Sequence, residues 1–199
     1  MKLFKKTKFN DNLQGKRIGV LGLSPRCGTT TVALAIGNHL SDSGGKTVCI
    51  IEKNKHDDFR SLISELGGEA VDGTFTHHRV TYVCSGAGEA NGLLDLSFDC
   101  TVFDLGSDFE AALPTMCLCD YRILVGSSAP WRRGEYELLG RLADKTDSML
   151  SWRLFINLGN PGQSLIYKMP GPETFCFPFE PDPVYPGPEV TKLLEAVLN

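Results

Sequence analysis

Residues 17–40 read RIGVLGLSPRCGTTTVALAIGNHL, and this stretch decides the fold class. Its first seven residues form a short apolar run, the pattern of a strand that is buried on both faces. At about 30–43 the apolar side chains recur at helical spacings, with Val32, Ile36 and Leu40 on one face. A buried strand that passes through a glycine-containing turn into a helix predicts an α/β protein.

Short apolar runs alternate with amphipathic segments along the rest of the chain. We expect further strands at 47–51, 80–84, 101–105, 121–125, 152–158 and 174–177. We expect further helices at 57–66, 131–148 and 188–198. Because strands that alternate with helices form parallel sheets, this order predicts a mainly parallel sheet of about six to eight strands with helices on both faces, a three-layer α/β/α fold.

The composition is that of an ordinary globular protein, since 42% of the 199 residues are hydrophobic and 22% are charged. This length fits a single domain at 17–199, preceded by a basic segment at 1–16 that we expect to be flexible. The uncharged apolar runs are far shorter than the roughly 18 residues that cross a bilayer. Seven cysteines, an odd number, indicate free thiols in a reducing compartment and therefore a cytoplasmic protein.

Charge is unevenly distributed along the chain. Residues 1–17 carry six Lys and Arg against one Asp, whereas the whole chain has a net charge of −4. The basic start predicts weak contact with an anionic membrane surface, which would place the protein at the inner face of the membrane. The acidic remainder argues against a nucleic-acid partner, because nucleic-acid affinity comes mostly from phosphate neutralisation.

The turn LSPRCGTTT at 23–31 lies where a phosphate-binding loop would lie, between a buried strand and the N-terminus of a helix. The usual pattern of such a loop is GxxxxGK followed by Ser or Thr. Gly28 and Thr30 match the last glycine and the hydroxyl residue, but Leu23 and Thr29 replace the first glycine and the lysine. The local context therefore fits a phosphate-binding loop, whereas the motif itself is incomplete.

Six segments together resemble the MinD/ParA group of P-loop NTPases, over about residues 16–199. The turn at 23–31 stands where that group has GKGGVGKTT. The other segments are IIEKN at 50–54, FDCTVFDLGS at 98–107, CDYRILVGSSAPW at 119–131, FINLGN at 155–160 and FPFEPD at 177–182. The sequence DLG at 104–106 is similar to the TadZ/CpaE branch of this group, whose members localise secretion machinery.

The resemblance implies a site for ATP or ADP with Mg²⁺, or a decayed site with no cofactor. The loop would contact the phosphates, Asn157 and Pro178 would lie at the adenine, and Thr30 with Asp104 would hold the metal ion. The nucleotide-binding residues that it implies are Ser24, Pro25, Arg26, Cys27, Gly28, Thr29, Thr30, Thr31, Asp104, Asn157 and Pro178.

Three positions depart from the pattern of the group. Ser24 and Thr29 replace its two lysines, and Asn54 replaces the acidic residue that positions the attacking water. Phosphoryl transfer depends on positioning and charge stabilisation, so losing one stabiliser typically costs about 10²–10³ in rate. Arg26 offers a cation within the loop, but Pro25 removes a backbone N–H. We therefore expect no catalytic residues and no competent ATPase.

Three functions remain open from the sequence. The first is a catalytically degenerate MinD/ParA-like protein, a pseudo-ATPase, that acts as a scaffold or localisation factor through protein partners or as a homodimer. The second is an ATP-dependent switch of the same group that uses Arg26, and the third is a small P-loop kinase-like enzyme. The cluster Trp131, Arg132 and Arg133 fits either a partner-docking spot or the surface of a helix start with one buried tryptophan.

Overall fold

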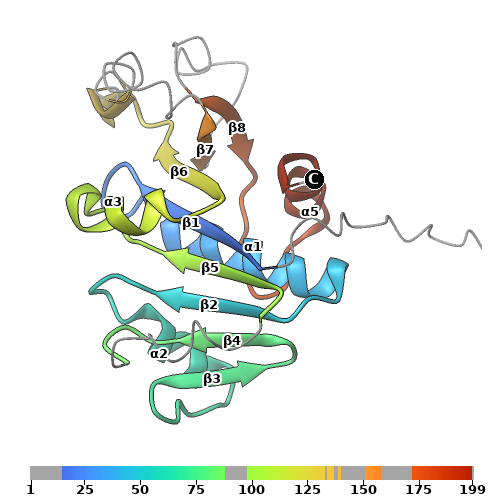
Figure 1. The fold of residues 1–199 in the computed structure, drawn as a ribbon. Coiled ribbons are helices and arrows are strands. Elements are labelled where there is room, and N and C mark those ends of the chain that lie inside the picture. Colours follow the sequence, from blue (N-terminus) through green and yellow to red (C-terminus); the bar gives the residue numbers. More distant parts are fainter. Residues whose placement is uncertain are drawn as a thin grey trace, which may run out of the picture.

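An eight-stranded sheet forms the centre of the computed structural model, which describes residues 15–87, 98–132, 134–136, 139, 151–157 and 172–198 (Figure 1). The strands are β1 (Lys16–Gly22), β2 (Val48–Glu52), β3 (Thr74–His77), β4 (Val80–Val83), β5 (Cys100–Asp104), β6 (Tyr121–Ser127), β7 (Arg153–Asn157) and β8 (Glu173–Phe177). The helices are α1 (Thr29–Gly44), α2 (Asp58–Glu65), α3 (Phe109–Cys117) and α5 (Pro188–Leu198), with a short 3-10 helix, η3 (Pro130–Arg132).

The sheet is mainly parallel, as the sequence predicts. Its strand order is β3-β4-β2-β5-β1-β6-β7-β8, and each neighbouring pair is parallel except β3 with β4. β1 lies in the middle, where Val20 pairs with Asp104 of β5 on one side and with Ile123 of β6 on the other. The carboxyl ends of these parallel strands therefore meet at one edge of the sheet, which is where such folds bind ligands.

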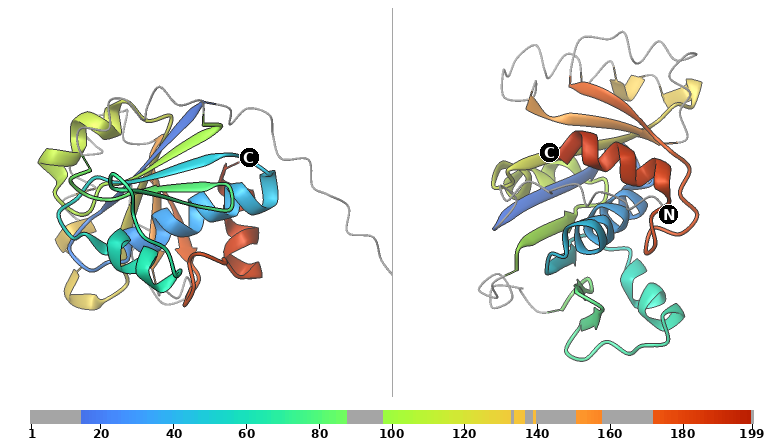
Figure 2. Two further views of the ribbon diagram at one scale, coloured as in Figure 1. Left: turned by 90° about the horizontal axis from the view of Figure 1, so that it is seen from below. Right: turned by 90° about the vertical axis from the view of Figure 1, so that its right-hand side faces the viewer.

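Helices cover both faces of the sheet (Figure 2). On one face α1, α2 and α5 pack in an apolar cluster that includes Ile36, Phe59 and Leu194. On the other face α3 packs in a second cluster, to which it contributes Met116. Each helix buries an apolar stripe that it could not bury alone, and this confirms the predicted three-layer α/β/α arrangement.

Helix α1 is largely buried under the sheet. Val32, Ile36 and Leu40 have no exposed surface, in agreement with the helical spacing in the sequence. A Cβ at Gly37 would lie 2.4 Å from Ile50 Cδ1 of β2. Glycine at this position therefore allows the helix to lie close against the strand.

The sequence pattern predicts neither β3 nor α3. β3 has four residues and reads TFTH, and its polar side chains lie at an edge of the sheet where little apolar alternation is needed. α3 contains Pro114, which argues against a helix in the sequence, but the Asp108 carboxylate caps its start by accepting a hydrogen bond from Ala111 N at 3.1 Å.

The helix expected at 131–148 is described only in part. Its first residues belong to η3, helical residues follow at 134–136 and 139, and residues 140–150 lie outside the described ranges. The basic segment expected to be flexible at 1–16 also lies outside them except for its last two residues. The other expected strands and helices are observed, with small differences at their ends.

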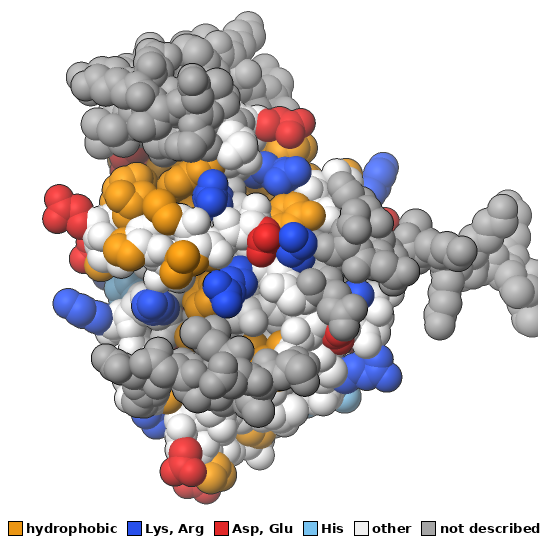
Figure 3. All heavy atoms as spheres, viewed as in Figure 1, with side chains coloured by type: hydrophobic (Ala, Val, Ile, Leu, Met, Phe, Trp, Pro, Cys, Tyr) orange, Lys and Arg blue, Asp and Glu red, His pale blue; other side chains and the backbone are white. Residues whose placement is uncertain are grey.

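The outer face of α3 is partly apolar. Leu113 is 38% exposed and Leu118, just after the helix, is 68% exposed, whereas Ala112 and Met116 are buried. Figure 3 shows apolar side chains gathered over this part of the molecule, with Lys and Arg side chains beside them. No helix in the described ranges is long and apolar enough to cross a membrane.

The buried ring of His39 in α1 gives a testable pH dependence. Burial lowers the pKa of His39 to about 4, from 6.5 in an exposed histidine. The stability that the neutral ring contributes is therefore present above pH 6.5 and is lost as the pH falls toward 4. Between pH 7 and pH 4.5 the free energy of unfolding falls in the wild type. We expect it to fall by about 2–3 kcal/mol less in the His39→Gln variant.

Urea unfolding of both proteins at the two pH values measures this difference. Asp104 and Glu52, whose carboxyl pKa values are raised mainly by burial, titrate in both proteins and cancel in the comparison. An unchanged pH dependence in the variant would contradict the assignment to His39.

Candidate functional site

A cavity of about 780 Å³ lies at the carboxyl ends of the central strands. Four segments form its wall: the β1–α1 connection, the residues at the start of α2, the turn after β5 and the end of η3. The described residues that line it are Ser24, Pro25, Arg26, Gly28, Thr29, Thr30, Thr31, His56, Asp58, Gly106, Ser107 and Arg132. The predicted phosphate loop therefore faces a real cavity.

Gly28 provides the sharp turn into α1. Its φ of 95° and ψ of 25° are left-handed, a conformation that side chains with a Cβ rarely adopt. A Cβ at Gly28 would also lie 2.0 Å from Asn157 Nδ2. Both the backbone conformation and the lack of space explain why this position of the loop is a glycine.

Two hydrogen bonds fix the loop residue Cys27 against the neighbouring strands. Its Sγ donates to Val125 O of β6 at 3.2 Å, and its carbonyl oxygen accepts a hydrogen bond from Asn157 Nδ2 at 3.1 Å. Cys27 is 4% exposed and packs in the core instead of lining the cavity. Asn157, which the resemblance places at the adenine, thus holds the loop in this structure.

Thr30 and Asp104 lie together, as the resemblance implies. Thr30 Oγ1 donates to Asp104 Oδ2 at 2.8 Å, and Asp104 Oδ1 accepts a hydrogen bond from Gly106 N at 3.1 Å. Asp58 Oδ2 is 3.4 Å from the same Thr30 oxygen. A hydroxyl beside two carboxylates is a set of oxygen ligands that suits Mg²⁺.

The carboxylates of this group differ in their surroundings. Asp104 has no exposed surface, and burial raises its pKa, with the hydrogen bonds from Thr30 and Gly106 acting in the opposite direction. Asp58 lines the cavity. Sequence reasoning did not identify Asp58, because nothing in the residues 50–58 reveals which acidic side chain turns toward Thr30.

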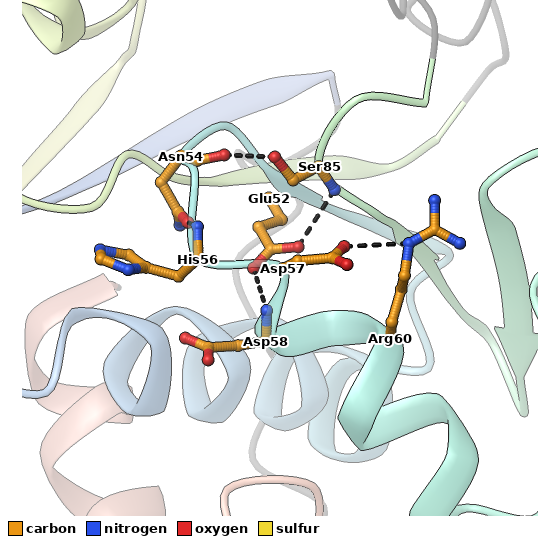
Figure 4. A network of polar contacts seen from close by, with 7 residues as sticks. All are labelled: Glu52, Asn54, His56, Asp57, Asp58, Arg60 and Ser85. Carbon is orange, nitrogen blue, oxygen red and sulfur yellow. Dashed lines mark hydrogen bonds and ion pairs between the residues drawn. The ribbon is translucent and has the colours of Figure 1, made fainter.

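A polar network around Glu52 positions Asp58 (Figure 4). Glu52 is 3% exposed, and its two carboxylate oxygens accept hydrogen bonds from Asp58 N at 2.6 Å and from Ser85 N at 3.0 Å. Burial raises the pKa of Glu52, and these backbone hydrogen bonds partly oppose that shift. The network fixes the start of α2 and thereby the place of Asp58.

Asn54 is part of the same network. Its Oδ1 accepts a hydrogen bond from His56 N at 2.8 Å, and its carbonyl oxygen accepts one from Ser85 Oγ. Its Nδ2 lies 3.5 Å from Asp104 O. The amide that replaces the acidic residue of the MinD/ParA pattern therefore shapes the turn between β2 and α2.

The two positions that carry lysine in the MinD/ParA pattern are nearly buried. Ser24 is 6% exposed and Thr29 is 8% exposed, and both line the cavity. Thr29 Oγ1 lies 3.5 Å from Cys27 Sγ. Arginine reaches the cavity from two other places, Arg26 in the loop and Arg132 at the end of η3.

The structure brings together most of the predicted site residues. The loop residues from Ser24 to Thr31 surround the cavity, except that Cys27 lies behind it, and Asp104 lies behind Thr30. Asn157 and Pro178 are absent from the described lining of the cavity, although Asn157 ends β7 and Pro178 follows β8 at the same edge of the sheet. Arg132 was predicted to lie at a docking spot or on a helix start with one buried tryptophan. It lines the cavity, and the prediction of a buried tryptophan is wrong, because Trp131 is exposed.

The strand order and the turn from β1 through Gly28 into α1 define a P-loop NTPase fold of the MinD/ParA type. No family model matches the chain, and no curated protein sequence matches it. Its similarity is to solved structures at low sequence identity, and this similarity concerns the fold.

One similar structure is a plasmid partition protein from Borrelia burgdorferi bound to AMPPNP, with a TM-score of 0.66 and 14% identity over 92% of this chain and 96% of that chain. Another is the septum site-determining protein MinD from Pyrococcus horikoshii with Mg-ADP, with a TM-score of 0.65 and 14% identity over 92% and 96%. A third is the MinC:MinD complex from Aquifex aeolicus, with a TM-score of 0.58 and 16% identity over 92% and 88%.

The contact between Gly28 and Asn157 can be tested by a double-mutant cycle. We expect Gly28→Ala to lower the free energy of unfolding by about 2–4 kcal/mol, because it adds left-handed strain and overlap with the Asn157 amide. In an Asn157→Ala background the same substitution should cost at least about 1 kcal/mol less, because the overlap is gone. Equal costs in both backgrounds, measured by urea unfolding, would contradict the predicted interaction.

Proposed function

We propose that this protein is a pseudo-ATPase of MinD/ParA fold that acts as a scaffold or localisation factor and does not turn over ATP. The observation that carries this proposal is the replacement of both lysines by short, nearly buried side chains, Ser24 and Thr29. Neither can bring a positive charge to the β- or γ-phosphate, where such charge stabilises the transition state of phosphoryl transfer.

The state of Asn54 supports the same proposal. It has no carboxylate with which to orient an attacking water, and its Oδ1 already accepts a hydrogen bond from His56 N. Loss of one electrostatic stabiliser typically costs about 10²–10³ in rate. Loss of two lysines and the acidic group together would leave hydrolysis negligible.

As a scaffold the protein would act through protein partners or as a homodimer, and it would be cytoplasmic or peripheral to the inner face of the membrane. The resemblance of the DLG segment to the TadZ/CpaE branch agrees with a localisation role. Aquifex MinD forms a complex with MinC, which gives a precedent for partner binding on this fold. Two exposed apolar side chains, Trp131 (82% exposed) and Leu118 (68% exposed), offer contact area for a protein partner. We propose no nucleic-acid partner.

A nucleotide-dependent switch with slow ATPase activity is the second candidate. Arg26 favours it, because this exposed residue of the loop lines the cavity and carries a positive charge. ATP or ADP with Mg²⁺ would be the ligand in that case, with Thr30 and Asp104 at the metal ion.

A phosphate-release assay with Mg-ATP separates the two candidates. We expect the wild-type protein to release phosphate at the background rate, because Ser24 and Thr29 bring no positive charge to the phosphates. Thr29→Lys alone should stay at background, because Asn54 still supplies no acidic group. Steady release by the wild type that Thr30→Ala abolishes would contradict the pseudo-ATPase and favour the switch.

The basic segment at 1–16 predicts weak binding to anionic vesicles. Each basic residue near such a surface contributes about 1 kcal/mol, and salt screens the attraction. We expect co-sedimentation with phosphatidylserine vesicles at low salt, and we expect it to fall when Lys2, Lys5, Lys6 and Lys8 are changed to Gln. Phosphatidylcholine vesicles are the control, and equal binding by both proteins would contradict a role of the segment.

A further inference from the structure

Arg132 is held at the wall of the cavity by the turn that follows β6. Its backbone N–H donates to the carbonyl oxygen of Ala129, the residue before η3, at 2.9 Å. Further along, the Tyr136 hydroxyl donates to Ser127 O at 2.7 Å, and its ring fills the space beside Gly126, where a Cβ would lie 2.2 Å from the hydroxyl oxygen. The hydrogen bond to Ala129 before Arg132 and the hydrogen bond of Tyr136 after it thus fix the turn that carries Arg132.

The side chain of Arg132 is also oriented. Its Nη1 donates to Glu135 Oε1 at 2.8 Å, and the two side chains are 34% and 22% exposed. A guanidinium has five N–H donors in a planar fork, so one ion pair sets its direction and leaves capacity for a second anion. Arg132 therefore presents a partly buried, directed cation to the cavity.

The loop side of the same cavity offers unsatisfied donors. Ser24 lines the cavity, and within the described part of the chain its buried Oγ has no hydrogen-bond partner. Helix α1 begins without a side-chain cap, and its first turn contains no acidic residue. No side chain of the helix's own first turn therefore compensates the positive end of the α1 dipole, which meets the cavity beside the carboxylates of Asp58 and Asp104.

We infer that Arg132 is a ligand-binding residue that contacts the phosphates of a Mg²⁺-bound di- or triphosphate. It would supply positive charge that the two lysine positions of the loop do not supply, because Ser24 and Thr29 stand there. This inference rests on the proposed function, since it concerns a cavity that binds without hydrolysis. Arg132 would approach the phosphates from the end of η3, and Ser24 and the start of α1 would approach them from the loop. The carboxylates of Asp58 and Asp104 would repel the phosphates unless Mg²⁺ lay between them, so binding requires the metal ion.

Titration calorimetry with Mg-ATP, Mg-ADP and Mg-tripolyphosphate tests the inference. We expect Arg132→Gln to weaken binding at least about tenfold, because it removes a charge-assisted contact. Ser24→Ala should weaken it several-fold, and removal of Mg²⁺ should abolish it. The matched control is Arg60→Gln, since Arg60 also forms an ion pair three residues away, with Asp57 at 3.0 Å, but does not line the cavity. This control should change the affinity less than about twofold.

Three results would overturn the inference. Arg132→Gln could leave the affinity unchanged, or Arg60→Gln could lose as much affinity as Arg132→Gln. The wild type could also fail to bind any of the three ligands at millimolar concentration. Melting curves of the unliganded variants establish that each is folded. Binding of tripolyphosphate as tightly as ATP would show that the phosphate chain is recognised, and preference for the nucleotides with the same Arg132 dependence also supports the inference. Turnover in the phosphate-release assay would overturn the proposed function while leaving this binding result valid.

Discussion

The hydrogen bond from Asn157 Nδ2 to the Cys27 carbonyl oxygen joins the first loop to the outer half of the sheet. The Cys27 thiol makes the second attachment, to Val125 O of β6. With the loop fixed to two strands, the left-handed Gly28 starts α1 at one place and in one direction. The position of Thr30 beside Asp104 follows from that start, and so does the exposure of the α1 N-terminus to the cavity.

The cavity has acidic and hydroxyl side chains beside Thr30 and two arginines elsewhere in its lining. Thr30, Asp58 and Asp104 form a set of oxygen ligands suited to Mg²⁺. The described lining of the cavity contains no lysine, and its positive charge comes from Arg26 and Arg132. A guanidinium binds phosphate oxygens as a planar fork, whereas a lysine acts as a compact charge that can follow the transferred group. This arrangement agrees with the proposed binding of a ligand without turnover.

The sequence was sufficient to predict what depends on local pattern. The apolar runs predicted the parallel strands, and the resemblance to the MinD/ParA group implied that Thr30 and Asp104 meet. Contacts that arise only in three dimensions were missed. Asp58 turns toward Thr30 because the buried Glu52 holds the start of α2, and Arg132 reaches the cavity because the chain turns sharply after β6. The edge strand β3 and the proline-containing α3 were missed because tertiary packing outweighs their weak local signals.

The contact between Gly37 of α1 and Ile50 of β2 sets how far the helix lies from the sheet. The two positions share one volume, so a larger residue at 37 is tolerated only where the residue at 50 is smaller, or else the helix rises and tilts. A tilt of α1 would move its first turn, which is about two turns away along the same rigid rod. In related sequences these two positions should therefore vary together. The size of a core side chain on β2 would then affect the direction in which the backbone N–H groups at the start of α1 point at the opening of the cavity.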